Sequence, residues 1–582
     1  MANRDRSEHD AQIDELMHAA ATRNVSRRDL VKRAAALGAG ASVLAGLNAV
    51  GGSAAPAMNR LKMMNAALQD QPLADEQVVR LPEGEPVYMD PGITGGGKGL
   101  EQLQNMFEGL VYIDQRDGSL QMGLAEKMEP NADDTVYTFT LRDGLKWSDG
   151  TPLTAHDFEW SWQRVLDPAT KSEYTTAMFP LKNGLAINQG KAQLTDLGVK
   201  ATDDKTLVVT LESATPYFPL LAATWTFYPV PKHVIDKAGD AWVEAGTVVG
   251  NGPYVLTAWE HNQTMTLEQN PNYYGDKPTI TKANYTLFDD NVAQALVPFE
   301  NDELDQAQVS EADLDRVKGD PTLSAQMQIF PRSGTKFLIC DTTNPPTDNV
   351  KVRQALSMAI SRDTLANGVL KGLYTPAPTM LPPDIPGNDP TAGLGEDVAK
   401  AKQLLAEAGF PDGKGFPNLQ FTYISTESDS KNSGQYLQNA WKQNLGIDVT
   451  LNPMEQKAFS DWADSLQTGT KFNLYILLWG SDWGDPANWH NQLFDSNSDA
   501  TYHAHWKNDQ FDQIVRAAVA NPDPEARIAQ YKQAEKILNQ DAAYISLYHL
   551  NRIYVIKPNI KGVYHYPILG RTWLKYMSVV ES

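Results

Sequence analysis

The stretch from residue 474 to residue 486 constrains the fold most, because an apolar run of strand length stops at a carboxylate between two tryptophans. It reads Leu-Tyr-Ile-Leu-Leu-Trp-Gly-Ser-Asp-Trp-Gly-Asp-Pro. Two other strand-like runs, 419–424 and 447–451, come before it, and helical sequence separates each run from the next. Strands that alternate with helices in this way predict a βαβαβ unit with a parallel sheet.

Asp482, just beyond the last of these strands, is the leading candidate for a binding residue. Ligands of open parallel sheets lie outside the carboxyl ends of the strands, so a side chain in this place is expected to face a crevice. The neighbouring Trp479, Gly480, Ser481 and Trp483 complete the candidate ligand-binding site. The plainer alternative is that Asp482 is a turn carboxylate that accepts hydrogen bonds from nearby backbone amides.

Length and charge narrow the class of protein. A single hydrophobic core stops growing near roughly 250 to 300 residues, so a chain of 582 residues is expected to form two or three lobes. The formal net charge of −22 disfavours nucleic acid as a partner, because a polyanion would be repelled over most of the surface. Cys340 is the single cysteine of the sequence, so no intrachain disulfide can form, and its apolar neighbours predict a small buried side chain.

The first 57 residues are typical of an export signal. Arg27 and Arg28 come before a weakly apolar run rich in alanine and glycine, 34–50, and Ala55-Pro56-Ala57 offers a cleavage site. The pattern resembles a twin-arginine signal and predicts a periplasmic or cell-surface protein. No cysteine lies near the cleavage point, which excludes a lipoprotein, and an uncut membrane anchor is the alternative.

The middle of the chain predicts a small α+β subdomain inserted within a larger lobe. Apolar and polar residues alternate over 136–141, as in a half-buried antiparallel strand. Thr154 and Asp157 have the spacing of a capping box that starts a helix. Further on, the proline-containing loop 342–346 is the expected hinge between lobes.

Several motifs, taken in order along the chain, resemble one family. They are Leu124-Ala125-Glu126, Arg142-Asp143-Gly144-Leu145-Lys146-Trp147-Ser148-Asp149-Gly150, Gly250-Asn251-Gly252-Pro253-Tyr254, Val352-Arg353-Gln354-Ala355-Leu356-Ser357-Met358-Ala359-Ile360 and Trp479-Gly480-Ser481-Asp482. From about Gln77 to its C-terminus the chain is similar to the extracellular solute-binding proteins of ABC importers, in the peptide and nickel group.

The resemblance implies a non-catalytic α/β protein with the type II periplasmic-binding-protein fold. Two ligand-binding lobes would close about a hinge, with an extra α+β subdomain, and the protein would deliver a short peptide to an ABC permease and ATPase complex. By the same resemblance Asp482 would pair with the α-ammonium group of the peptide, and Trp479 or Trp483 could add a cation–π face. We expect a monomer with no cofactor, no metal site and no nucleic-acid partner.

The expected organisation follows from these patterns. The expected segments are a signal at 1–57, a linker at 58–76, lobe I at 77–117, 246–340 and 549–582, the extra subdomain at 118–245, and lobe II at 341–548.

Other readings of the sequence stay open. An oligosaccharide or a nickel complex is an alternative cargo on the same fold, and His490, His503 and His505 are a conceivable metal set. A secreted hydrolase is a remote alternative, since Asp482 and Asp485 could be imagined as an acid and base pair. The simpler interpretation of Asp485 is a solvated aspartate at a helix start.

Overall fold

The computed structural model describes residues 71–288, 292–466, 469–498, 505–570 and 572–581. Residues Ala74 to Val580 form one compact unit. The expected signal, most of the linker and His503 lie outside the described residues. Among the described residues, no helix is both long and apolar enough to cross a bilayer.

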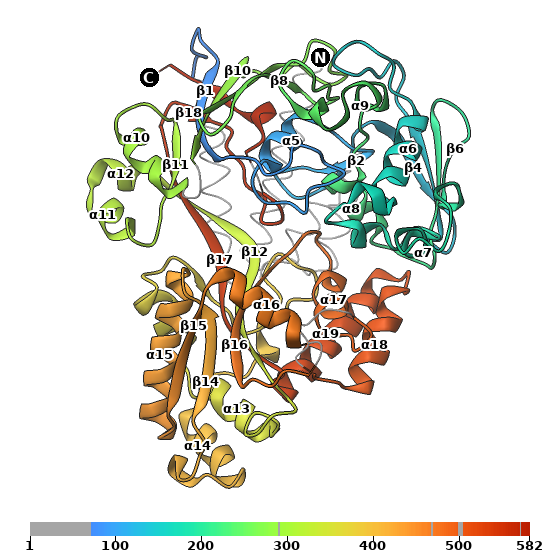
Figure 1. Ribbon diagram of the computed structural model, residues 1–582. Coiled ribbons are helices and arrows are strands. Elements are labelled where there is room, and N and C mark those ends of the chain that lie inside the picture. The colour runs from blue at the N-terminus through green and yellow to red at the C-terminus, as the bar shows by residue number, and fades with distance from the viewer. Residues whose placement is uncertain (1–70, 289–291, 467–468, 499–504, 571, 582) are drawn as a thin grey trace, which may run out of the picture. The chain divides into compact units, whose positions relative to one another are not determined.

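Two four-stranded sheets lie in the upper part of Figure 1, which is called lobe I from here on and includes the segment 118–245. The first has the order β1 (Val78–Gly84), β10 (Lys282–Phe288), β9 (Thr264–Gln269) and β8 (Tyr254–Glu260). The second is antiparallel, with the order β4 (Ala125–Pro130), β5 (Val136–Leu141), β7 (Thr206–Thr210) and β6 (Val199–Ala201). Two short pairs accompany them: β2 (Val111–Ile113) with β3 (Leu120–Met122), and β18 (Ile560–Lys561) with β19 (Ser578–Val579).

Helix α6 (Ala155–Leu166) of lobe I starts where the sequence predicts a helix start. The Thr154 and Asp157 side chains form the expected capping box there. Trp162 on this helix is fully buried and belongs to the core beneath the second sheet. The other helices are α5 (Leu100–Met106), α7 (Gly184–Asn188), α8 (Phe218–Leu221), α9 (Lys232–Ala238), α10 (Leu296–Glu300), α11 (Leu314–Gly319) and α12 (Pro321–Gln326).

A seven-stranded sheet continues into lobe II. Its order is β11 (Gln306–Gln308), β17 (Tyr544–Ile556), β12 (Met327–Cys340), β16 (Leu474–Gly480), β14 (Leu419–Ile424) and β15 (Val449–Met454), with β13 (Thr375–Pro376) beside β17. β14 is parallel to both β15 and β16, so the predicted βαβαβ unit is confirmed. β12 and β17 run antiparallel to each other.

Within the lobe II sheet, β12 and β16 are buried on both faces over 337–340 and 474–476, which explains their uninterrupted apolar runs. Leu338 and Cys340 pack into one core, whereas Phe337 and Ile339 between them pack into the other. Figure 1 shows α15 on one side of β14, β15 and β16, and α17, α18 and α19 on the other. The helices are α13 (Val350–Met358), α14 (Val398–Glu407), α15 (Ser428–Leu445), α16 (Gln456–Leu466), α17 (His490–Phe494), α18 (Asp509–Val519) and α19 (Pro524–Asp541).

The loop 342–346 does not connect the lobes, so the expected hinge position is wrong. Within β12, Phe330 packs against the core of lobe I, whereas Leu338 already belongs to a core of lobe II. The chain therefore crosses inside the strand, and the register between β12 and β17 shifts between Arg332 and Thr335. The loop lies at the far end of β12, where the Asn344 side chain donates a hydrogen bond to the Phe472 carbonyl.

Candidate functional site

The end of β16 places Asp482 at the edge of the lobe II sheet. Backbone pairing with β12 continues to Gly480, and the Ser481 amide then donates to the Ser333 carbonyl at 2.8 Å. The Ser481 hydroxyl is buried and accepts a hydrogen bond from Trp489 Nε1 at 2.9 Å. The next amide, that of Asp482, donates to Asn488 Oδ1 at 3.0 Å. These contacts hold the backbone, so the carboxylate of Asp482 extends from a fixed turn.

The Asp482 carboxylate meets lobe I through one side chain. The Tyr174 hydroxyl donates to Asp482 Oδ2 at 2.6 Å, across 308 residues of sequence. Tyr174 is itself held in place, because its ring stacks on Trp225 with centroids 5.2 Å apart. The carboxylate is therefore held between the lobes, by a side chain far away in the sequence. This differs from the plainer alternative, in which Asp482 would accept hydrogen bonds from nearby backbone amides.

Burial sets the electrostatics of this contact. Burial raises the pKa of the Asp482 carboxyl above its ordinary value, while the Tyr174 hydroxyl and the positive charge of Arg332 oppose that rise. Burial, together with the negative charge of Asp482, also raises the pKa of Tyr174 well above its ordinary value. The tyrosine consequently remains a proton donor, and the carboxylate can still gain from a cationic partner.

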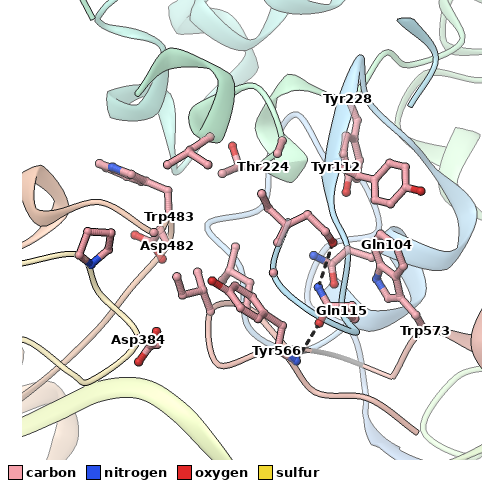
Figure 2. Close-up of a pocket in the computed structure, with 18 residues that line it drawn as sticks. Gln104, Tyr112, Gln115, Thr224, Tyr228, Asp384, Asp482, Trp483, Tyr566 and Trp573 are labelled. Carbon is pink, nitrogen blue, oxygen red and sulfur yellow. Dashed lines mark hydrogen bonds between the residues drawn. The ribbon is translucent and has the colours of Figure 1, made fainter. Parts of the chain in front are cut away.

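Two cavities adjoin at Asp482. The first, of about 230 Å³, is drawn in Figure 2, where Asp384 and Asp482 lie on one side and Gln104, Tyr112 and Trp573 on the other. Among the described residues, its lining contains two carboxylates and no lysine, arginine or histidine. Aromatic side chains supply much of the rest of the wall, as in most small-molecule sites. They are Tyr112, Tyr228, Trp483, Tyr566 and Trp573.

The second cavity, of about 280 Å³, has the opposite charge balance. Asp482 also lines it, together with Arg332 and Arg552. Phe330 on β12 pairs with Arg552 on β17, so Arg332, two residues further along β12, presents its side chain on the same face of the sheet as Arg552. The site therefore changes from acidic to basic across Asp482.

The five residues predicted for the site all line one or both of these cavities. Trp483 lines the first, Trp479, Gly480 and Ser481 line the second, and Asp482 lines both. The Trp483 ring stacks nearly parallel to Tyr217, with centroids 6.5 Å apart. Trp479 Nε1 donates to the Asn488 carbonyl at 3.0 Å, which fixes the orientation of that ring.

Four polar atoms on residues of the first cavity are buried without a hydrogen-bond partner among the described residues. Two are acceptors, Gln104 Oε1 and Asp384 Oδ2, and two are donors, Trp483 Nε1 and Trp573 Nε1. Buried polar groups are nearly always paired in folded proteins, so a cluster of exceptions in one cavity calls for an explanation. A ligand that carries both donors and acceptors would satisfy them.

Comparison with known proteins places the chain in a family. The sequence pattern of the bacterial extracellular solute-binding proteins, family 5, matches residues 119–501. The chain belongs to this family. It is 35% identical to the probable deoxycholate-binding periplasmic protein YgiS of Escherichia coli K12 over 501 residues, 84% of this chain and 91% of the relative. It is 32% identical to the oligopeptide-binding protein OppA of Bacillus subtilis 168 over 490 residues, 82% of this chain and 88% of the relative.

Solved structures of family 5 proteins share the fold. The crystal structure of Haemophilus influenzae OppA in complex with RPPGFSPFR matches with a TM-score of 0.69 at 28% identity, and covers 88% of this chain and 100% of that protein. The type II periplasmic-binding-protein fold implied by the sequence motifs is thereby confirmed. Proteins of family 5 bind solutes, which is the class that the sequence favoured over a hydrolase.

Two further predictions about this region concern the solvation of Asp485 and a metal site made of histidines. Asp485 is not solvated: its carboxylate is buried and takes two hydrogen bonds from Arg527, each of 2.6 Å. Its role at the start of a helix is confirmed, since Oδ1 accepts from the Ala487 amide.

His490 pairs with buried Glu535, and His505 contacts Asp341, so each has a structural partner. Among the described residues, no group of three or more candidate ligands could hold a metal ion.

Sequence reasoning missed the residues that face Asp482 from elsewhere in the chain. Tyr174 lies in a short segment before a 3₁₀ turn, and Asp384 lies in a loop after two prolines. Tyr566 follows the last long strand, and its backbone amide donates to Gln115 Oε1 at 3.3 Å. None of these segments has a periodic pattern or a motif, so only the folded chain brings them together.

Proposed function

We propose that this family 5 protein captures short peptides between its lobes and delivers them to an ABC permease and its ATPase. The carrying observation is the Asp482 carboxylate, which lies where two cavities adjoin and where lobe I meets lobe II. A peptide α-ammonium group placed there would gain a charge-assisted hydrogen bond in a site that is shielded from water. Relatives named as oligopeptide-binding proteins support this choice of cargo.

The exposed edge of β16 supports an extended peptide backbone as the second element of recognition. β14 pairs with β16 only at Leu474 and Tyr475, whereas β12 pairs with β16 as far as Gly480. Among the described residues, the rest of β16 therefore has a paired strand on one side only. A peptide that added to this edge would be held through its main chain, which tolerates many side-chain sequences.

Closure would occur about β12 and β17, the paired strands that cross between the lobes. A ligand drives closure only if it binds the closed state better than the open one. A peptide held by Asp482 on lobe II and by cavity walls on lobe I meets that condition, because neither lobe alone completes the site. The closed form would then be the state that the permease recognises.

Export and assembly belong to the same proposal. Arg27 and Arg28 would direct export through a twin-arginine route, with cleavage near Ala57, to a periplasmic or cell-surface location and without a lipid anchor. The mature protein would act as a monomer. Relatives named as periplasmic support the location.

Deoxycholate, oligosaccharides and nickel complexes are the competing cargoes. The name of the relative YgiS suggests deoxycholate. An anionic steroid would be repelled in the first cavity, because the part of its lining that the structure describes holds two carboxylates and no basic side chain. Calorimetric titration with a tripeptide mixture, deoxycholate, cello-oligosaccharides and nickel separates these options. We expect heat of binding with peptides, and binding of only one of the others would contradict the proposal.

On acidification, peptide affinity is expected to fall at a higher pH than it would if Asp482 had the ordinary pKa of an aspartate. An ammonium group binds the ionised form of Asp482, and burial raises the pKa of that carboxyl, so protonation competes with the ligand as pH falls through the raised value. Titration of a neutral tripeptide at decreasing pH measures this midpoint.

Tyr174→Phe provides the matched test of the pH effect. The Tyr174 hydroxyl stabilises the ionised carboxylate, so its removal is expected to raise the pKa of Asp482 further. The midpoint for loss of affinity should then move to higher pH. A midpoint that stays in place in this variant would show that Asp482 is not the group that controls affinity.

A further inference from the structure

The first cavity contains one charged group that the capture of a peptide amino terminus leaves unused. Asp384 lines it beside Tyr566; a hydrogen bond from the Ser333 side chain stabilises the ionised carboxylate, whereas its Oδ2 atom is buried with no hydrogen-bond partner among the described residues. A peptide α-ammonium at Asp482 would neutralise one of the two carboxylates. The second would then remain without a counter-charge among the described residues that line the cavity.

The loop that carries Asp384 is held firmly, so the carboxylate has a defined position. The neighbouring Ile385 is buried in a lobe II core. The Ile385 amide donates to the Pro382 carbonyl at 3.1 Å, and Asn388 Nδ2 donates to the Leu381 carbonyl at 2.6 Å. A buried carboxylate on a well-packed loop is ready to bind a cation without further ordering of the loop.

The wall next to Asp384 is equally constrained. A side chain at Gly118 would overlap the Tyr566 ring, with a Cβ only 2.1 Å from it, so glycine at this position lets the ring lie against the backbone. Burial, together with the negative charges of Asp384 and Asp117, raises the pKa of Tyr566 to about 12. The tyrosine therefore stays neutral, and Asp384 and Asp482 are the acidic residues of the lining.

We propose that Asp384 is a specificity residue that selects peptides whose amino-terminal residue has a cationic side chain, such as lysine, ornithine or arginine. The α-ammonium would bind Asp482 while the side-chain cation binds Asp384, so that both carboxylates on this side of the cavity are paired (Figure 2). An uncharged side chain of the same length would leave the buried Asp384 carboxylate without a counter-charge, which is costly. The inference rests on the proposed function, because it assigns the first side chain of a bound peptide.

A pair of isosteric peptides tests the inference. The first side chain ends in an ammonium group in Lys-Ala-Ala and in a methyl group in norleucine-Ala-Ala. Calorimetric titration measures the affinity of the protein for each peptide. We expect the wild-type protein to prefer the lysine peptide by about tenfold or more, since a buried charge-assisted hydrogen bond is at stake. In Asp384→Asn the preference should disappear, and the affinity for the norleucine peptide should be equal to or higher than in the wild type, because its side chain no longer leaves a buried charge uncompensated.

Controls separate failure of this inference from failure of the proposed function. Asp389→Asn, five residues further along the same loop and outside the cavity lining, should keep the lysine preference. Equal affinity of wild-type protein for the two peptides would overturn the inference but leave peptide capture intact. A preference that survives Asp384→Asn would overturn it as well. If neither peptide binds and the tripeptide mixture also fails, the proposed function itself is contradicted. Should Asp384→Asn fail to fold, the wild-type comparison still decides.

Discussion

Asp482→Asn is expected to weaken binding of a short neutral peptide by about 2–5 kcal/mol, which corresponds to roughly 30-fold to several thousand-fold in Kd. The asparagine keeps the size of the side chain and an acceptor for the Tyr174 hydroxyl, but it removes the negative charge. The peptide ammonium would then enter an enclosed site without a counter-ion. Much of the loss is the cost of that uncompensated charge rather than the value of one hydrogen bond.

The same substitution is expected to leave the unliganded protein at least as stable as the wild type. Burial raises the pKa of Asp482, which means that the folded protein disfavours its ionised form. A neutral side chain avoids that cost at neutral pH, so the midpoint of thermal unfolding should stay constant or rise. Loss of affinity together with unchanged stability would identify a binding residue, because a structural residue would show the reverse.

Asp461→Asn is the matched control for this experiment. Asp461 lies on α16 with its side chain 63% exposed and forms an ion pair with Lys457 one turn earlier. Asp461 lines neither cavity, so the same loss of one negative charge at this exposed site should change peptide affinity little. Peptide affinity in Asp482→Asn that equals the affinity of the Asp461→Asn protein would contradict the assignment of the ammonium site.

The sheet of lobe II could be predicted from the sequence because its strands carry their own signal. The run 474–479 is apolar at every position, and the structure shows why: alternate residues enter two different cores, whereas in the run 419–424 the apolar Leu419, Phe421 and Tyr423 enter one core. Parallel strands separated by helices then fix the edge at which a ligand can bind. The position of Asp482 at that edge follows from these local facts alone.

The hinge and the other cavity walls could not be predicted, because they depend on contacts between distant segments. A strand that passes from one core to another looks like any long strand, so β12 gave no sign of the crossing, whereas the Pro345-Pro346 loop looked like a break. Tyr174 and Asp384 come from segments without periodicity. Their meeting with Asp482 is a result of how the lobes pack.

The burial of Asp485 could not be predicted either, because it also depends on a residue that is distant in the sequence. An aspartate before a proline is usually a helix cap at the surface, and the cap is present here. Asp485 is buried against Arg527 on α19, which lies 42 residues further along the sequence. Each terminal nitrogen of Arg527 donates a hydrogen bond to one of the two carboxylate oxygens. The guanidinium also lies over the rings of Tyr217 and Tyr531, at 5.4 and 5.1 Å from their centroids.

Asp485→Ala is therefore expected to lower the free energy of unfolding by about 3–5 kcal/mol, because it strands the charge of Arg527 in a site where that side chain is only 7% exposed. Denaturant unfolding followed by far-UV circular dichroism measures the loss. Asp523→Ala is the control: it removes an exposed cap of α19 and should cost about 1 kcal/mol.

A double variant shows whether the stranded charge or the lost contact causes this destabilisation. Asp485→Ala combined with Arg527→Met replaces the guanidinium by an apolar side chain that can still pack against Tyr217 and Tyr531. If the stranded charge dominates, the double variant is more stable than Asp485→Ala alone. A double variant that is less stable than the single one would show that packing and hydrogen bonding of the guanidinium, such as the 3.0 Å bond from Arg527 Nε to the Ala518 carbonyl, outweigh the charge.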